Sequence, residues 1–290
     1  MKVLIVNDDY YIHDEDYVTV TMMNNIYELQ YLQKSNNRAN ITKINSDEYK
    51  VNATGEVRTF NKIKTRNESE NSLKQTFKRL RYLINTNFTG GMNELFITLT
   101  FSDVSISKNI SNIYLEFNKF MKRLKYKYGK DLEYITVIEP HDIKDNDLKN
   151  WHGFHLHVLL KKLNAKLFIH YSDLVKIWGL GYVEVKRLND VDNIGAYLSA
   201  YLTNIQEDNV DIKTSEKKYV KGSRLWLYPK GVRIYRKSKG INNPKRIKMT
   251  YKDAKEMIGV TPHYKKSYFI ETHDFSNIII FEQYNRKRRK

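Results

Sequence analysis

The spacing of apolar residues predicts alternating strands and helices between residues 95 and 204. Segments 95–101 and 134–139 are short and rich in β-branched and aromatic residues, which favours strands. Segment 110–128 carries apolar side chains at helical spacing on one face, and Gly129 follows it, which indicates a helix that ends there.

Residues 151–160 read W-H-G-F-H-L-H-V-L-L and predict a third strand. Successive side chains of a strand point to opposite faces, so His155 and His157 share one face while Leu156 and Val158 point to the other. Helices are predicted at 165–178 and 192–204, with a fourth strand at 182–186. This order predicts an α+β fold: a central antiparallel sheet with helices on one face, the ferredoxin-like arrangement. We expect the other face, which carries the histidines, to stay open.

The flanking regions are organised differently. Residues 72–85 predict a helix in which Ser72 and Gln75 form a capping box. Short strands and turns are expected in 1–66 and again after residue 211, at 224–228 and 277–281. We therefore divide the chain into an N-terminal region, a central domain and a basic C-terminal region, with bounds at 1–90, 91–207 and 208–290.

Charge adds a binding partner to this outline. The net charge is +17, and residues 211–290 hold 22 lysine and arginine residues against 7 acidic ones, a net of +15. Such a local excess suits the phosphate backbone of nucleic acid. A solvated basic surface that keeps the protein in solution is the alternative. Interleaved aromatic side chains, on which bases can stack, favour nucleic acid; they are Tyr219, Trp226, Tyr228 and Tyr235.

Composition excludes several classes of protein. The chain has no cysteine, which rules out disulfides and thiolate metal sites and fits a cytoplasmic location. No apolar run reaches membrane-spanning length, and the N-terminus becomes acidic too early for a signal peptide. A phosphate-binding G-x-x-x-x-G-K-[ST] loop is also missing, so we do not expect a nucleotide-driven motor.

A metal site is predicted beside the histidine strand. Glu139 ends the preceding strand, which should pair with it and bring a carboxylate next to His155 and His157. Two imidazoles and one carboxylate suit Mg²⁺ or Mn²⁺ and leave positions open for a substrate oxygen. His141 and His152 are rival third ligands, although loop positions also explain them. In the alternative interpretation, the histidines only bond to neighbours on a half-buried strand.

Two tyrosines supply a second kind of chemistry. Tyr197 and Tyr201 are separated by four residues in a predicted helix, so both phenols can approach the same point. Near a divalent metal and a phosphodiester, a phenol can act as a nucleophile, leaving a 5′-phosphotyrosine and a free 3′-hydroxyl. Its ordinary pKa near 10 must then be lowered, or its proton taken. Alternatively, both tyrosines only flank the buried row of that helix.

Together these segments resemble replication initiators of the HUH endonuclease superfamily, the rolling-circle Rep proteins of small plasmids and single-stranded DNA phages. Three motifs in the same order carry the resemblance: F-I-T-L-T-F at 96–101, G-F-H-L-H at 153–157 and Y-L-S-A-Y at 197–201. It implies metal-dependent nicking and joining of single-stranded or hairpin origin DNA by Tyr197 and Tyr201, with metal ligands His155, His157 and Glu139. A host helicase and a host polymerase are the implied partners.

The third motif departs from the family pattern. Relatives usually carry a lysine three residues after a nucleophilic tyrosine, whereas Ala200 and Asn204 stand at these positions. Either another cation substitutes, such as Lys186 or a residue of the C-terminal region, or turnover is impaired. Single-tyrosine relatives favour Tyr201 as the first nucleophile. Other interpretations are a relaxase or tyrosine transposase of the same superfamily, a non-catalytic DNA-binding regulator that retains the fold, and an RNA-binding module.

Overall fold

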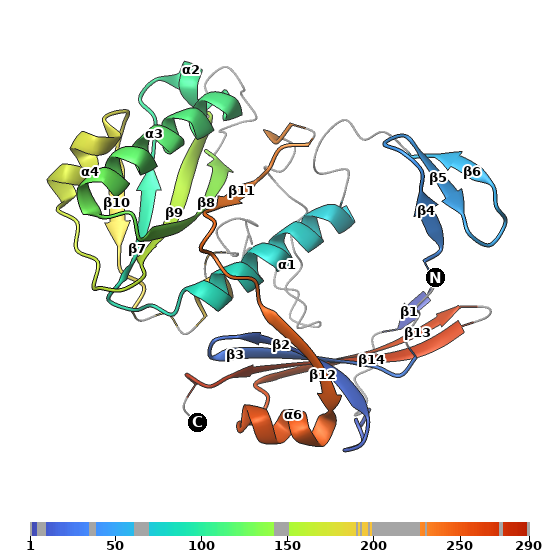
Figure 1. The fold of residues 1–290 in the computed structure, drawn as a ribbon. Helices are drawn as coiled ribbons and strands as arrows, with labels where there is room; N and C mark the ends of the chain where they lie inside the picture. The colour runs from blue at the N-terminus through green and yellow to red at the C-terminus, as the bar shows by residue number, and fades with distance from the viewer. Residues whose placement is uncertain are drawn as a thin grey trace, which may run out of the picture. The chain divides into compact units, whose positions relative to one another are not determined.

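The computed structural model divides the chain into two compact units, each with its own hydrophobic core (Figure 1). The first unit combines residues 1–64 with 245–290, and the second comprises 65–244. The residues that the structure describes are 2–4, 10–34, 39–60, 70–141, 151–189, 191, 193–196, 198, 227–229, 231–272 and 275–288.

The second unit is built on a five-stranded antiparallel sheet with the order β10-β7-β9-β8-β11. Its strands are β7 (Glu94–Leu99), β8 (Leu132–Pro140), β9 (Phe154–Lys162), β10 (Val183–Lys186) and β11 (Tyr235–Lys237). In β10-β7-β9-β8, the fourth, first, third and second strands lie side by side, which is the ferredoxin-like order. The predicted α+β class is therefore confirmed. The added edge strand β11 comes from the segment that the sequence assigned to a separate C-terminal region.

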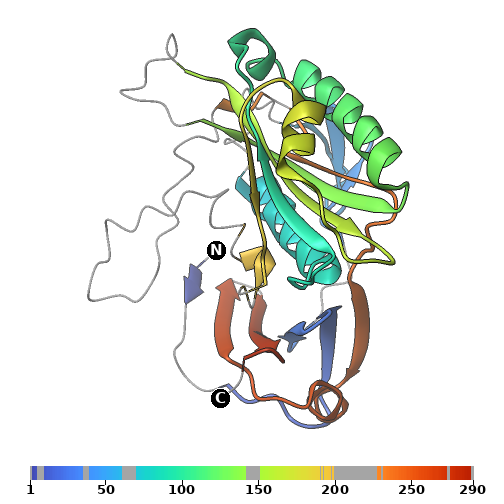
Figure 2. The same cartoon turned by 90° about the vertical axis from the view of Figure 1, so that its left-hand side faces the viewer.

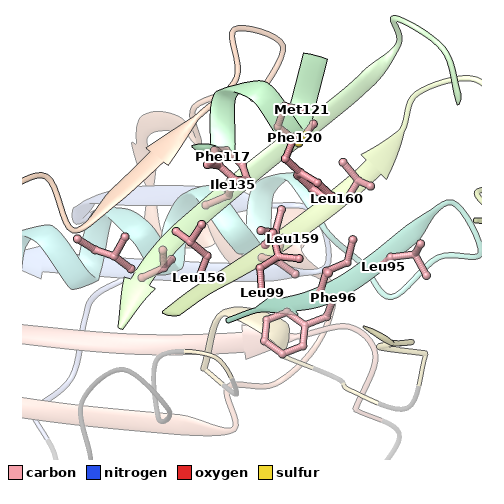
Figure 3. Packing of buried hydrophobic residues seen from close by; sticks show 14 of the residues in the cluster. Leu95, Phe96, Leu99, Phe117, Phe120, Met121, Ile135, Leu156, Leu159 and Leu160 are labelled. Atoms are coloured by element: carbon pink, nitrogen blue, oxygen red, sulfur yellow. The ribbon is translucent and has the colours of Figure 1, made fainter. Parts of the chain in front are cut away.

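One face of this sheet is covered by α3 (Ile110–Tyr128), as predicted. Asn109 caps the helix by accepting hydrogen bonds from the backbone N–H groups of Ser111 and Asn112, and Gly129 ends it. Phe117, Phe120 and Met121 of α3 belong to one core with strand residues such as Leu156 and Leu160 (Figure 3). The short helix α2 (Val104–Ser107) precedes α3.

Helix α4 (Tyr171–Trp178) starts later than the sequence pattern predicted. Residues 166–170 alternate between exposed and buried, with Leu167 and Ile169 buried, as in an extended segment. The backbone N–H of Leu167 donates to the carbonyl of Met92 at 3.1 Å, a bond that a helix at this point would not make. The predicted helix over 165–178 is thus only its second half.

The second face of the sheet is not open, in contrast to our expectation. Helix α1 (Glu70–Asn87) lies across it, on the side opposite α3 and α4 (Figure 2). Apolar side chains alternate onto this face too, among them Phe96 and Leu159, and they require a cover. Ser72 lies inside α1, where its carbonyl accepts a hydrogen bond from the Thr76 hydroxyl, so the predicted capping box is wrong.

The first unit contains a six-stranded sheet of order β1-β13-β14-β3-β2-β12. Its strands are β1 (Lys2–Leu4), β2 (Tyr17–Met23), β3 (Ile26–Leu32), β12 (Lys245–Thr250), β13 (Tyr264–Thr272) and β14 (Phe275–Asn285). Helix α6 (Tyr251–Ile258) packs on one face, where Ala254 and Ile258 join Val20, Leu29 and Ile280 in the core. A separate three-stranded sheet consists of β4 (Ile41–Lys43), β5 (Glu48–Val51) and β6 (Val57–Thr59).

The three-region division predicted from the sequence is not the grouping that the structure shows. Strands from both ends of the chain hydrogen-bond in the six-stranded sheet, while α1 joins the core of the second unit. Among the described residues, no helix is both long enough and apolar enough to cross a membrane.

Candidate active site

The two histidines and the glutamate predicted as metal ligands lie together on the face of the sheet that α1 covers. Strands β8 and β9 pair as predicted, with Glu139 directly opposite His155 and Val137 opposite His157. On the other side of β9, Thr98 of β7 is opposite His157. Directly opposed residues in an antiparallel pair project to the same face, so strand register alone brings these side chains together.

The ligand atoms converge on one point. The Oε2 atom of Glu139 lies 2.6 Å from Nε2 of His157 and 3.3 Å from Nε2 of His155. The two imidazole Nε2 atoms are 2.9 Å apart, and all three ligand atoms lie within 4.8 Å of one another. Within the described part of the chain, this is the group of imidazole and carboxylate ligands that could hold a metal ion.

These separations fit a six-coordinate divalent ion. Mg²⁺ prefers octahedral geometry with ligands at about 2.1 Å, which places neighbouring ligand atoms about 3 Å apart. The distances of 2.6, 2.9 and 3.3 Å bracket that value. Imidazole and carboxylate ligands suit Mn²⁺ as well, and three protein ligands leave coordination positions for water or substrate oxygens.

Neighbouring groups set the charge and the tautomer of this site. Burial alone would raise the pKa of Glu139, but hydrogen bonds from His155 and His157 lower it to about 2, so the carboxylate is ionised at neutral pH. The Thr98 hydroxyl lies 3.2 Å from Nδ1 of His157. When Nδ1 donates its proton to this hydroxyl, the Nε2 lone pair is directed at the point shared with Glu139.

The rival ligands His141 and His152 do not belong to this group. The His141 ring packs beside that of His155, with centroids 4.4 Å apart. Its backbone N–H donates to the Gly153 carbonyl and its own carbonyl accepts from the Trp151 indole, which closes the end of the β8–β9 pair. The His152 carbonyl accepts a hydrogen bond from the Ser107 hydroxyl.

Tyr197 and Tyr201, the predicted nucleophiles, lie outside the described residues, as do Ala200 and Asn204. Residues 194–196 and 198 of the predicted helix over 192–204 are described and helical. Leu198 is buried and lines a small cavity on the histidine face. The other residues that line it are Ile84, Phe96, Ile135, Val137, His157 and Leu159. The segment that contains Tyr197 in the sequence is therefore anchored beside His157.

Helix α1 fixes the start of this segment, a contact that the sequence did not reveal. The backbone N–H of Gly195 donates to Oδ1 of the buried Asn85 at 2.8 Å. A Cβ atom added at Gly195 would lie 2.6 Å from this oxygen and 2.8 Å from the carbonyl oxygen of Arg81. Only glycine allows so close an approach. The Asn193 side chain caps the same turn by accepting from the Ala196 backbone N–H.

A comparison with protein families places this site in a functional context. Residues 94–206 match the model of the Replication-associated protein ORF2 family. The matched region includes Glu139, His155 and His157 and extends in sequence over Tyr197 and Tyr201. No curated protein and no solved structure gives a match. The family match supports a replication initiator role, and with it DNA binding, for this chain.

Proposed function

We propose that this protein initiates rolling-circle replication by nicking and rejoining one strand of its origin through a 5′-phosphotyrosine intermediate. Glu139, His155 and His157 would hold Mg²⁺ or Mn²⁺, and Tyr197 and Tyr201 would act as nucleophiles. One observation carries the proposal: three converging metal-ligand atoms share a sheet face with the start of the segment that contains both tyrosines. The replication-associated family match over the same residues supports it.

When bound, the divalent ion would polarise the scissile phosphate and stabilise its developing negative charge. The phenol oxygen of one tyrosine attacks the phosphorus and loses its proton. The bond from phosphorus to the 3′ oxygen breaks, and that oxygen leaves as a hydroxyl after it takes up a proton. The 5′ end stays on the protein, and the free 3′-hydroxyl later reverses the chemistry at a new junction.

Lys186 is our choice for the cation that replaces the lysines missing at Ala200 and Asn204. It is directly opposite Phe96 in the β10–β7 pair, and Phe96 lies on the histidine face, so the lysine stem starts from that face. Its Nζ is 2.9 Å from Glu184, and half of its side chain is exposed to solvent. A mobile lysine at the edge of the sheet could reach a phosphate on that face.

Partners follow from this chemistry. The free 3′-hydroxyl would prime a host polymerase, and a host helicase would unwind the duplex, because the sequence has no nucleotide-hydrolysing motif. Both steps place the protein in the cytoplasm. A non-catalytic DNA-binding regulator is the second candidate, and the replacement of the expected lysines by Ala200 and Asn204 is the observation that favours it.

Covalent capture separates these two functions. The protein is incubated with Mn²⁺ and single-stranded DNA of the inverted repeat nearest its gene, labelled on the 3′ side of the repeat. We expect a labelled protein–DNA band that survives denaturing electrophoresis, requires the metal and disappears on protease treatment. DNA binding without such a band, in Mg²⁺ and in Mn²⁺, would instead identify a regulator.

Substitution of Gly195 by alanine tests whether α1 positions the nucleophile segment. The new methyl group would collide with Asn85 and displace the following residues, and a misplacement of about 1 Å can slow a reaction about a hundredfold. We expect the rate of adduct formation to fall about 10- to 100-fold, while Mn²⁺ affinity measured by calorimetry is unchanged.

Ala196→Ser is the matched control, because Ala196 is exposed in the same turn. It should form the adduct at the wild-type rate. Equal rates for Gly195→Ala and wild type would show that the contact with Asn85 does not control the position of the tyrosines.

A further inference from the structure

The six-stranded sheet of the first unit has one face that α6 does not cover. The α6 side holds the apolar core, with Val18, Val20 and Leu29. By strand alternation, the opposite side carries polar, basic and aromatic residues. We name it the polar sheet face; its central residues are Tyr17, Thr19, Gln30, Lys248, Lys266, Tyr268 and Phe281.

One row of this face runs across five strands and has a lysine at each end. The pairings join Lys266 to Phe281, Phe281 to Gln30, Gln30 to Thr19 and Thr19 to Lys248. Neighbouring strands lie about 4.8 Å apart, so the two lysine positions are separated by roughly 19 Å. Between them the row presents an aromatic ring and uncharged hydrogen-bonding groups.

Each of these lysines stands beside an aromatic ring. Lys266 Nζ lies 5.1 Å from the ring centroid of Tyr268, and Lys248 Nζ lies 5.5 Å from that of Tyr17. Tyr17 is 61% exposed, and the Tyr268 ring packs edge-on against Phe281 with centroids 6.0 Å apart. Rings next to cations, on a surface with few acids, are the combination that binds single-stranded nucleic acid.

The charge balance of the face points the same way. Arg246 adds a third cation on β12, and its Nε donates to the Thr21 hydroxyl of β2. Among the described strand positions that alternate onto this face, Glu28 is the acidic residue, and the Gln283 amide donates a hydrogen bond to its carboxylate. The face is thus net positive, as a phosphate-binding surface requires.

We propose that the polar sheet face binds single-stranded DNA, with Lys248 and Lys266 on phosphates and Tyr17 and Tyr268 stacked on bases. Aromatic rings on a sheet need bases with free faces, which a duplex does not offer, whereas duplex readers insert a helix or ribbon into a groove. This surface belongs to a different unit from the candidate metal site. The proposal goes beyond the nicking function, because it requires no cleavage.

Binding in EDTA tests this surface without strand cleavage. The full-length variant Lys248→Ala/Lys266→Ala is titrated against fluorescein-labelled oligo(dT), with anisotropy as the readout and salt varied. Each lost phosphate contact should lower the slope of log K against log salt by about 0.7, so the pair should lower it by about 1.4. We also expect Tyr17→Ala, at an exposed position, to weaken binding about 5- to 100-fold.

The matched control is Lys252→Ala/Lys265→Ala, which removes the same charge from the α6 side. Lys252 is on α6, and Lys265 is opposite Glu282, outside the polar sheet face. This variant should keep the wild-type slope. Equal slopes for both double variants would overturn the proposal, and so would a duplex that binds as tightly as oligo(dT) and loses as much. Wild-type oligo(dT) affinity in Tyr197→Phe/Tyr201→Phe would separate this surface from the nicking function.

Discussion

Replacing Tyr197 and Tyr201 together by phenylalanine should abolish the covalent protein–DNA adduct while single-stranded DNA binding stays at the wild-type level. Phenylalanine keeps the ring but lacks the oxygen that would attack phosphorus. Loss of a nucleophile typically costs far more than loss of a positioning group, so we expect adduct formation to fall at least about a thousandfold. Densitometry of the labelled adduct against time measures this rate.

The single variants distinguish the roles of the two tyrosines. If the nucleophiles alternate, the variant that keeps the first nucleophile should cleave but fail to rejoin, and the other should fail to cleave. The resemblance to single-tyrosine relatives makes Tyr201→Phe the variant expected to lose cleavage. Products of both steps are resolved with a substrate that carries two origin copies, on which complete turnover releases a closed circle.

Tyr126→Phe is the control for the loss of a phenol, because Tyr126 is 95% exposed on α3, the helix that covers the opposite face of the sheet. It should leave the adduct unchanged. An adduct that persists in Tyr197→Phe/Tyr201→Phe would show that the nucleophile lies elsewhere, and the tyrosine assignment would fail even if metal binding were intact.

Local pattern was enough to predict the ligand group of the candidate site. Alternation along β9 places His155 and His157 on one face without knowledge of the rest of the chain. Glu139 joins them because β8 directly precedes β9 and pairs with it antiparallel. Each step needs only neighbouring segments, which is why the sequence sufficed.

The cover over the histidine face could not be assigned from local pattern. Helix α1 shows an apolar stripe with Leu80 and Ile84, but a stripe does not say which surface it packs against. A signal was nonetheless present in the strands. Phe96 and Leu159 alternate with residues of the α3 side, and strands that are apolar on both faces must be covered on both.

Long-range strand pairing was also beyond the sequence. The alternating run at 17–22 predicts a strand, but nothing in it identifies β12, more than 200 residues later, as its partner. Edge strand β11 is only three residues long and lies in a segment whose strongest feature is its charge. Pairings between distant segments depend on the packing of the whole unit, so three consecutive regions were the simplest but incorrect division.

Removal of the metal ligands should affect both metal affinity and adduct formation. Glu139→Gln keeps the size of the side chain but removes the charge that the low pKa maintains, and His157→Ala removes an imidazole that both Glu139 and Thr98 contact. We expect Mn²⁺ affinity to fall about 10- to 100-fold in Glu139→Gln and further in His157→Ala, because even the loss of an outer-shell partner has a cost of this size. Calorimetry with Mn²⁺ measures both.

The dependence of cleavage on metal concentration then separates ligand loss from misfolding. A weakened site fills at higher concentration, so millimolar Mn²⁺ should restore adduct formation in Glu139→Gln. His141→Ala is the matched control, because His141 packs against His155 but lies outside the converging group. It should bind Mn²⁺ as the wild type does. Were His141→Ala to lose the metal and Glu139→Gln to keep it, His141 would be the third ligand, and the acid at 139 would only orient the imidazoles.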